Sequence, residues 1–157
     1  MFWYAVPKRM ETLMVRDLSI ADRQAIDRTL ALHGHIFDRG ELDRLEEIFT
    51  PEIVYDLSDV GAGTFEGLEA IRSGALQLGA GNPIAHHVTN TVITSHQDDL
   101  ATAQSKGLII MADGSVASVT HLDTLRRGDS SRRISRRVIQ AQRTPLGGLY
   151  PTHTGER

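Results

Sequence analysis

The sequence predicts an α+β fold, because helical segments come first and a run of strands comes last. Apolar residues recur at helical spacing between residues 18 and 49, and again between residues 68 and 78. From residue 85 to residue 143 the pattern changes to the alternation of half-buried strands, separated by short turn sequences. This order favours helices packed on one face of a curved, mostly antiparallel sheet.

Length and composition restrict the classes of function. A chain of 157 residues has the size of one domain with a sizeable core. Its 24% of charged residues and its formal net charge of -3 are ordinary for a globular protein, and they favour neither nucleic acid nor a membrane surface as a partner. The absence of cysteine excludes disulfides, thiolate metal sites and cysteine nucleophiles.

The N-terminal run from Met1 to Pro7 is apolar, and Lys8 and Arg9 follow it. This run is too short for the core of a signal peptide or for a membrane span. We therefore expect a cytoplasmic protein with no membrane partner. We expect residues 1–17 to form a leader, residues 18–145 a single domain and residues 146–157 a tail.

The first helix is predicted to begin after Ser19 and to run to about Phe37. Ser19 is a typical N-cap, Asp22 stands at the capping-box position, and Gly40 is a typical residue just beyond a helix. Four residues at helical spacing form its inward stripe: Ile26, Leu30, His33 and Phe37. One polar ring, that of His33, therefore faces the core.

The remaining elements follow from the same two patterns. A short second helix is predicted through Leu42, Leu45, Ile48 and Phe49, and a strand from Glu52 with Ile53, Tyr55 and Leu57 on one face. A third helix is expected over residues 68–78. Four strands are then expected over residues 85–94, 101–111, 116–127 and 132–143.

The strand that contains His86 combines apolar and polar residues on one predicted face, namely His86, Val88, Asn90 and Val92. The two valines indicate that this face is buried. A histidine and an asparagine there must be hydrogen-bonded or line a cavity, because an unpaired buried polar group is unfavourable. For His86 alone, a hydrogen-bonded core histidine is the simplest interpretation.

Asp38 stands at the C-terminal end of the first helix, where the helix dipole disfavours a carboxylate. Either free solvation or a cationic partner would explain it. If the partner is His86, the carboxylate would fix the imidazole tautomer and make the ring a competent general base. His33 on the helix and His121 on a later strand are expected to point toward the same interior, which we predict to hold an apolar pocket.

Two other kinds of site are less favoured by the sequence than this acid/base pair. His33 and His35 cannot chelate a metal through one helix face, and His86 and His87 cannot do so through one strand face, so we expect no metal. The last hairpin carries six arginines: Arg126, Arg127, Arg132, Arg133, Arg136 and Arg137. Without interleaved aromatic residues, they favour a solvated strand face or a subunit rim over a nucleic-acid site.

Five stretches carry a resemblance to a known family: IADRQAI from residue 20, FDRGE from 37, IFTPEIVYD from 48, FEGLEAI from 65 and HHVTN from 86. From Ser19 to Arg143 the chain resembles the SnoaL-like branch of the nuclear transport factor 2-like superfamily. The resemblance implies a cone-shaped α+β barrel of three helices and a curved sheet that encloses a pocket. It also implies a homodimer or a higher homo-oligomer.

The resemblance also implies roles for individual residues. In dehydratase-type members an aspartate at the end of the first helix orients a histidine on a strand, and Asp38 and His86 match these positions. The tyrosine or lysine that is frequent five residues before the aspartate is His33 here. A tyrosine common two residues before an acidic residue is His121 here, before Asp123. This difference, together with the absence of the tryptophan that is usual in the last hairpin, suggests a more polar pocket than a steroid binder has.

The function that we expect is that of a cofactor-independent lyase or isomerase, a dehydratase, double-bond isomerase or cyclase, acting on a hydrophobic oxygenated small molecule. His86 would be the base and Asp38 would hold it. His33 and His121, together with Tyr55 and Asn90, would polarise a carbonyl or protonate a departing oxygen. The alternative is a non-catalytic protein, either a ligand carrier or a small scaffold subunit of an aromatic-ring oxygenase. An epoxide hydrolase is a third possibility, weakened by the lack of several pocket carboxylates.

Overall fold

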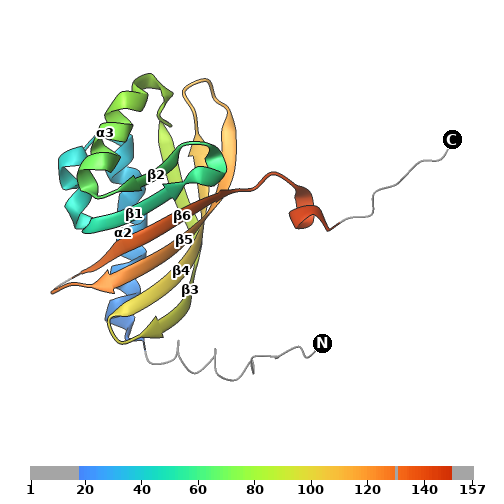
Figure 1. Ribbon diagram of the computed structural model, residues 1–157. Coiled ribbons are helices and arrows are strands. Elements are labelled where there is room, and N and C mark those ends of the chain that lie inside the picture. The colour runs from blue at the N-terminus through green and yellow to red at the C-terminus, as the bar shows by residue number, and fades with distance from the viewer. Residues whose placement is uncertain (1–17, 130, 150–157) are drawn as a thin grey trace, which may run out of the picture.

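The computed structural model describes residues 18–129 and 131–149. The predicted leader, residues 1–17, and residues 150–157 of the predicted tail lie outside this part. The main elements, in chain order, are α2 (Ile20–Asp38), η1 (Leu42–Glu47), β1 (Phe49–Leu57), β2 (Gly63–Glu66), α3 (Leu68–Leu78), β3 (Ala85–Gln97), β4 (Leu100–Ile110), β5 (Val116–Arg127) and β6 (Arg132–Ala141) (Figure 1). No helix of the described part is long and apolar enough to span a membrane.

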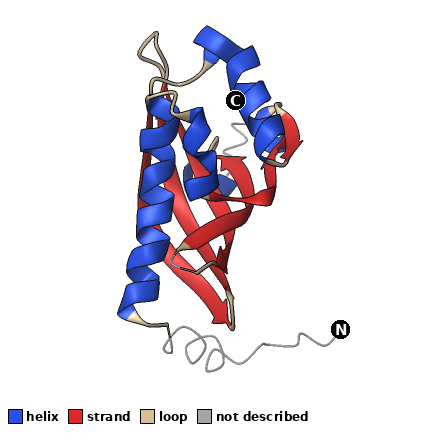
Figure 2. Cartoon of the chain, turned by 90° about the vertical axis from the view of Figure 1, so that its left-hand side faces the viewer, coloured by secondary structure: helices blue, strands red, loops and turns tan. Residues whose placement is uncertain are grey.

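The six strands form one sheet in the order β2-β1-β6-β5-β4-β3. β1 and β6 run parallel, and every other pair of neighbours is antiparallel. α2 runs along one face of this curved sheet and contacts β3 and β6, whereas α3 packs against β1 and β2 at one end (Figure 2). The predicted α+β fold, with helices on one face of a mostly antiparallel sheet, is confirmed.

The ends of α2 agree with the capping residues in the sequence. The Ser19 hydroxyl accepts the main-chain N–H of Asp22 at 3.0 Å, which is an N-cap hydrogen bond. Gly40 adopts the left-handed conformation at φ +66°, which stops the helix. α2 therefore ends at Asp38, one residue beyond the predicted end at Phe37.

The core lies between α2, η1 and the facing side of the sheet. Its fully buried apolar residues include Ile26, Leu30, Ile36, Leu45, Ile48, Phe49, Ile53, Leu125 and Ile134. The prediction that the second helix extends to Phe49 is wrong, because Phe49 is the first residue of β1 and pairs with Ile134 of β6. The N–H of Ile134 donates to the oxygen of Ile48 at 2.8 Å, so strand pairing begins three residues before the predicted start at Glu52.

Most other boundaries lie near their predicted positions. α3 and β5 have the predicted bounds, whereas β3 continues to Gln97 and β6 ends at Ala141. β2 was not predicted, because a segment of four residues that begins with glycine is too short to show the alternation typical of a strand. Its pairing with β1, for example Phe65 with Tyr55, is what makes it a strand.

A β-bulge interrupts β3 after Thr89. Thr89 pairs with Lys106 and Val92 pairs with Gln104, so two residues of β3 oppose one residue of β4. Asn90 has a φ of +53°. The extra residue reverses the alternation, so that Val92 is 59% exposed while Ile93 packs against the core. The prediction that Asn90 and Val92 share the buried face of His86 is therefore wrong.

Candidate active site

Asp38, the last residue of α2, and His86, the second residue of β3, are in direct contact. Nδ1 of His86 lies 2.6 Å from Oδ1 of Asp38, and the main-chain N–H of His86 donates to Oδ2 at 3.1 Å. Because a carboxylate oxygen can only accept, Nδ1 carries the proton and Nε2 is the basic nitrogen. The side chains of His86 and Asp38 are 16% and 26% exposed, so solvent reaches the pair.

A glycine on α2 allows this contact. A Cβ atom at Gly34 would overlap the main-chain oxygen of His86. Only a residue without a side chain lets the last turns of α2 lie this close to the start of β3. The close approach brings the carboxylate of Asp38 to both the ring and the main chain of His86.

His33 lies beside this pair and is fully buried. The centroid of its ring is 5.6 Å from that of His86 and 4.6 Å from that of Phe37. Its Nε2 lies 3.4 Å from the hydroxyl oxygen of Tyr55, whereas its Nδ1 has no hydrogen-bond partner among the described residues. Aromatic and imidazole rings thus surround His33 in the interior where the sequence predicts an apolar pocket.

The surroundings of His33 keep it neutral. Burial lowers the pKa of His33 well below its ordinary value, and the positive charge of Arg137 lowers it further. A neutral imidazole has one donor and one acceptor nitrogen. His33 can therefore donate a hydrogen bond to an oxygen, but its ring carries no positive charge in the folded protein.

His121, on β5, is also buried and neutral. Its Nδ1 lies 3.2 Å from the hydroxyl oxygen of Ser105, and its ring centroid is 6.3 Å from that of His33. Burial lowers the pKa of His121 to about 2, with the charge of Arg137 as the next cause. The ring lies over Gly107, where an added Cβ would be 2.7 Å from Cε1 of His121.

A buried ion pair that was not predicted from the sequence lies on the same side of the sheet. Arg137 of β6 donates from Nε to Oδ1 of Asp123 at 2.7 Å and from Nη2 to Oδ2 at 2.8 Å. Neither side chain is exposed at all. Burial raises the pKa of the neighbouring Tyr55, and the positive charge of Arg137 opposes that rise. The inward alternation of His121, Asp123 and Leu125 was the available signal for the acidic partner.

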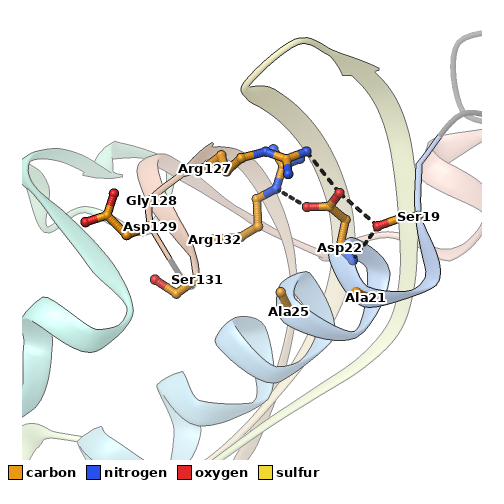
Figure 3. A pocket seen from close by; sticks show the side chains of 9 residues that line it. All are labelled: Ser19, Ala21, Asp22, Ala25, Arg127, Gly128, Asp129, Ser131 and Arg132. Atoms are coloured by element: carbon orange, nitrogen blue, oxygen red, sulfur yellow. Dashed lines mark hydrogen bonds and ion pairs between the residues drawn. The ribbon is translucent and has the colours of Figure 1, made fainter.

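The interpretation of the hairpin arginines as a solvated face is wrong for Arg132 and Arg137, which are both fully buried. Arg132 is buried because its charge is neutralised and its donors are used. It donates from Nε to Oδ1 of Asp22 at 3.0 Å (Figure 3). It also donates from Nη1 to the main-chain oxygen of Asp99 at 3.0 Å. Arg127 reaches the second carboxylate oxygen of Asp22 at 2.9 Å, which anchors the start of α2 to the last hairpin.

The other predicted site residues separate into two groups. Tyr55 and His121 lie with His33 in the interior, as described above. Asn90 does not, because the bulge in β3 leaves it exposed. No signal in the sequence marks the bulge, apart from the ability of asparagine to adopt a positive φ.

Two hollows lie elsewhere on the described part of the chain. One, of about 200 Å³, lies between the start of α2 and the β5–β6 hairpin, where Asp22 meets Arg127 and Arg132 (Figure 3). The other, of about 220 Å³, lies on the sheet and is lined in part by Thr102 and Leu122. None of the predicted site residues lines either hollow. Within the described ranges, no group of three or more His, Cys, Asp or Glu side chains could hold a metal ion.

Comparisons with known proteins agree with this architecture. A family model described as SnoaL-like domain matches residues 18–138. None of the curated proteins matches the sequence. Among solved structures, a nuclear transport factor 2-like protein with a cystatin-like fold from Novosphingobium aromaticivorans is 21% identical, with a TM-score of 0.66 over 92% of this chain and 95% of that chain.

Two further solved structures from the same organism carry functional names. A candidate scytalone dehydratase is 17% identical, with a TM-score of 0.68 over 82% of this chain and 89% of that chain. The beta subunit of a candidate aromatic-ring-hydroxylating dioxygenase is also 17% identical, with a TM-score of 0.61 over 80% of this chain and 92% of that chain. At these identities the similarity establishes the shared cone-shaped fold. Because the family model spans residues 18–138, the chain belongs to the SnoaL-like domain family.

Proposed function

We propose that this protein is an acid/base enzyme that removes a proton next to the carbonyl group of a hydrophobic oxygenated small molecule. Dehydration, a double-bond shift or ring closure would follow, and no cofactor would take part. The observation that carries the proposal is the double contact of Asp38 with His86, at 2.6 Å to Nδ1 and 3.1 Å to the main-chain nitrogen.

In this proposal His86 is the base. Asp38 accepts the Nδ1 proton, which leaves the lone pair of Nε2 to take a proton from substrate carbon. When the ring becomes an imidazolium, the adjacent carboxylate stabilises the new charge. Because the side chain of His86 is partly exposed, the captured proton can exchange with solvent.

His33, Tyr55 and His121 would supply hydrogen bonds to the oxygen of the substrate. His33 and His121 are neutral because burial lowers the pKa of each, so they would act as hydrogen-bond donors rather than as charged acids. The hydroxyl of Tyr55, 3.4 Å from Nε2 of His33, is the third donor of this group. Fixed donors directed at an oxygen that gains negative charge lower the barrier to proton removal. Asn90 is exposed and takes no part in the proposal.

Exchange of carbon-bound hydrogen for deuterium tests the proton-removal step, and this test does not require that the natural substrate be known. A panel of small ketones, including 1-indanone and 1-tetralone, is incubated with the protein in D2O, and loss of the α-proton signal is followed by NMR. We expect exchange above the buffer rate for at least one ketone. His86→Ala and Asp38→Asn should each slow it by about 100-fold or more, because a positioned base contributes roughly that much.

His87→Ala is the matched control, because His87 is the next residue of β3 and its side chain is exposed. It should leave exchange unchanged, and all variants should melt near the wild-type temperature. Retained exchange in folded His86→Ala would overturn the proposal.

A non-catalytic role is the competing interpretation. One structural neighbour is the beta subunit of a candidate dioxygenase, and a scaffold subunit needs no base. Native mass spectrometry of the protein purified from the organism that produces it distinguishes the catalytic role from the scaffold role. A stable complex with a larger iron-containing chain, unaffected by His86→Ala, would favour the scaffold. The same measurement gives the oligomeric state, which we propose to be a homodimer or larger homo-oligomer.

A further inference from the structure

The side of strands β3–β6 that is turned away from α2, which we call the outer face, carries no carboxylate. α2 lies behind these strands in Figure 1. β3, β4 and β6 contain no aspartate or glutamate, and the one acidic residue of β5 is Asp123. Its carboxylate is buried on the inner face, where Arg137 binds it. In a chain with a formal net charge of -3, four strands without an outward acidic group are unusual.

The outer face does carry positive charges. Its cationic residues, each next to a buried residue of its own strand, are Lys106, Arg126, Arg133 and Arg136. Arg126 and Arg133 stand directly opposite each other in the pairing of β5 with β6, and like charges in such a position destabilise a sheet. Nη2 of Arg136 lies 3.8 Å from Oδ2 of Asp56, which is beyond hydrogen-bond distance. This charge pattern favours an anionic ligand on the outer face.

The hollow of about 220 Å³ lies on this face, beside Arg136. Its polar lining residues come from all four strands: Thr94, Thr102, Gln104, Thr124 and Arg136. Asp123 also lines it, but its buried carboxylate belongs to the inner face. The nearest outward acids, Asp56 and Glu66, belong to β1 and β2, which lie on the other side of β6 from the hydroxyl groups. The hollow therefore offers hydrogen-bond donors and one cation, without a carboxylate among them.

The hydroxyl groups of the hollow have hydrogens to spare. Oγ1 of Thr102 lies 2.7 Å from Oγ1 of Thr94 and 2.6 Å from Oγ of Ser95. Each hydroxyl carries one hydrogen, so three hydrogens serve two contacts, and at least one is left to donate outside this cluster. The guanidinium of Arg136 can only donate. An acceptor with several oxygens would satisfy these donors together.

We propose that this hollow binds the phosphate group of a small molecule. A guanidinium donates two parallel hydrogen bonds to a phosphate, and the hydroxyls of Thr102 and Thr124 come from the neighbouring strands. A phosphate presents oxygens in several directions, whereas a carboxylate presents two in one plane. Leu122 and Val138, which also line the hollow, would contact the rest of the molecule. At about 220 Å³ the hollow is smaller than typical ligand pockets of roughly 300 Å³ or more, so it suits a small group.

This site lies on the opposite side of the sheet from Asp38 and His86, so the inference does not depend on the proposed function. Binding of phosphate in a protein without exchange activity would refute only the catalytic role of His86. Exchange activity in a protein that binds no phosphate would refute only the site on the outer face.

The first experiment is an NMR titration of the protein with inorganic phosphate, with benzoate as the planar comparison. Sodium chloride keeps the ionic strength constant, because salt screens exposed charges. The amide signals of Thr102, Thr124 and Arg136 should shift to saturation, whereas that of His86 should not. Phosphate should bind at least about threefold more tightly than benzoate, the effect of one additional hydrogen bond. Shifts that do not saturate, or equal affinity for both anions, would overturn the proposal.

Arg136→Gln tests the cation of the hollow. Loss of a charge-assisted hydrogen bond should weaken phosphate binding by about tenfold. Arg39→Gln is the matched control, because Arg39 is also exposed, lies outside the hollow and has an equally loose contact, at 3.9 Å from Glu41. It should bind phosphate as the wild type does. Unchanged binding in Arg136→Gln, or an equal loss in Arg39→Gln, would contradict a site in this hollow.

Thr124→Val tests the hydroxyl donors, because valine keeps the shape of threonine and lacks its hydroxyl. Phosphate binding should weaken by about threefold or more. Thr89→Val removes the hydroxyl of an exposed residue of β3 that does not line the hollow, and it should have no effect. Equal affinities of the two variants would mean that phosphate responds to the charge of the outer face alone, which would overturn the assignment to the hollow.

Two further measurements identify the source of the phosphate group. Glycerol 3-phosphate should bind at least as tightly as inorganic phosphate and shift the same signals. Sedimentation of the protein with phosphatidic acid vesicles, without saturable binding of either soluble phosphate, would point to a membrane lipid and overturn the proposal. Shifts of the same signals on dilution, again without phosphate binding, would show that a second copy of the chain covers this face and would also overturn it.

Discussion

Asp38 binds His86 through both of its carboxylate oxygens, one at the imidazole Nδ1 and one at the main-chain nitrogen of the same residue. A contact to the ring alone would leave the strand free to shift. The second contact fixes the strand as well as the ring. The pair is therefore a rigid connection between the C-terminus of α2 and the start of β3. The protonation of the imidazole depends on whether the atom of residue 38 that faces Nδ1 accepts or donates a hydrogen bond.

Asp38→Asn is expected to change the tautomer of His86. An asparagine offers one oxygen and one NH2 group, and the main-chain N–H of His86 requires the oxygen. The NH2 group then faces Nδ1 and makes it an acceptor, so the ring proton moves to Nε2. Nitrogen-15 NMR of the imidazole should report a protonated Nδ1 in the wild type and a protonated Nε2 in the variant. Identical tautomers in both proteins would contradict this account of the base.

Gly34→Ala is expected to destabilise the protein, although alanine is normally better than glycine inside a helix by roughly 1 kcal/mol. The added Cβ would overlap the main-chain oxygen of His86. Relief of such overpacking typically costs about 1–3 kcal/mol. Urea unfolding measures the change, and the NMR signals of His86 should shift with it.

Gly128→Ala is the control for this substitution, because the nearest atom to its added Cβ, the oxygen of Ser131, would be 3.6 Å away. Its free energy of unfolding should change by less than about 0.5 kcal/mol. If Gly34→Ala is as stable as this control, α2 and β3 are not in the close contact described here.

The positions of Asp38 and His86 could be predicted from the sequence for a local reason. Ser19 and Gly40 mark the two ends of α2 through short-range hydrogen bonding and backbone conformation, so the position of Asp38 follows from the residues around it. His86 lies at the start of β3, before any irregularity, and simple alternation places it correctly. The position of a residue can be predicted from the sequence where it depends only on the helix or strand that contains the residue and on the ends of that element.

The failures have the opposite cause, because they depend on pairing between strands. The bulge in β3 places Asn90 outside, and a second register shift in β6 places both Ile134 and Arg137 on the inner face. An alternation rule cannot detect an inserted residue without knowledge of the partner strand. The Asp123–Arg137 pair was missed for this reason.

Substitutions at Asn90 test the bulge. Asn90 has a φ of +53°, a conformation that glycine adopts freely and that costs other residues roughly 1–2 kcal/mol, with β-branched side chains among the worst. Asn90→Gly should leave the free energy of unfolding nearly unchanged, whereas Asn90→Val should lower it by about 1–2 kcal/mol. Because the side chain is exposed, packing contributes little to either change. Equal stability of the two variants would argue for regular pairing through β3.

The two buried neutral histidines are expected to make the fold sensitive to mild acid. The folded-state pKa values of His33 and His121 are both lowered from 6.5, that of His121 to about 2. Below pH 6.5, therefore, the two histidines bind protons in the unfolded state but not in the folded state. The free energy of unfolding consequently falls as the pH falls. Each histidine should contribute a slope of roughly 1.4 kcal/mol per pH unit in this range. Carboxylates lose their stabilising effect only below about pH 4.5. Urea unfolding measured between neutral pH and about pH 4.5 therefore reports the contribution of the histidines to the pH dependence of stability.

His121→Gln should reduce that slope to about half of the wild-type value, because His33 still titrates on unfolding. His87→Gln removes an exposed imidazole from β3 and should leave the slope unchanged. The absolute stability of His121→Gln at neutral pH is not the relevant quantity, since the contact with Ser105 also changes. A wild-type protein whose free energy of unfolding stays constant between neutral pH and about pH 4.5 would contradict the burial of neutral His33 and His121. It would also remove the physical reason for treating them as uncharged hydrogen-bond donors beside His86.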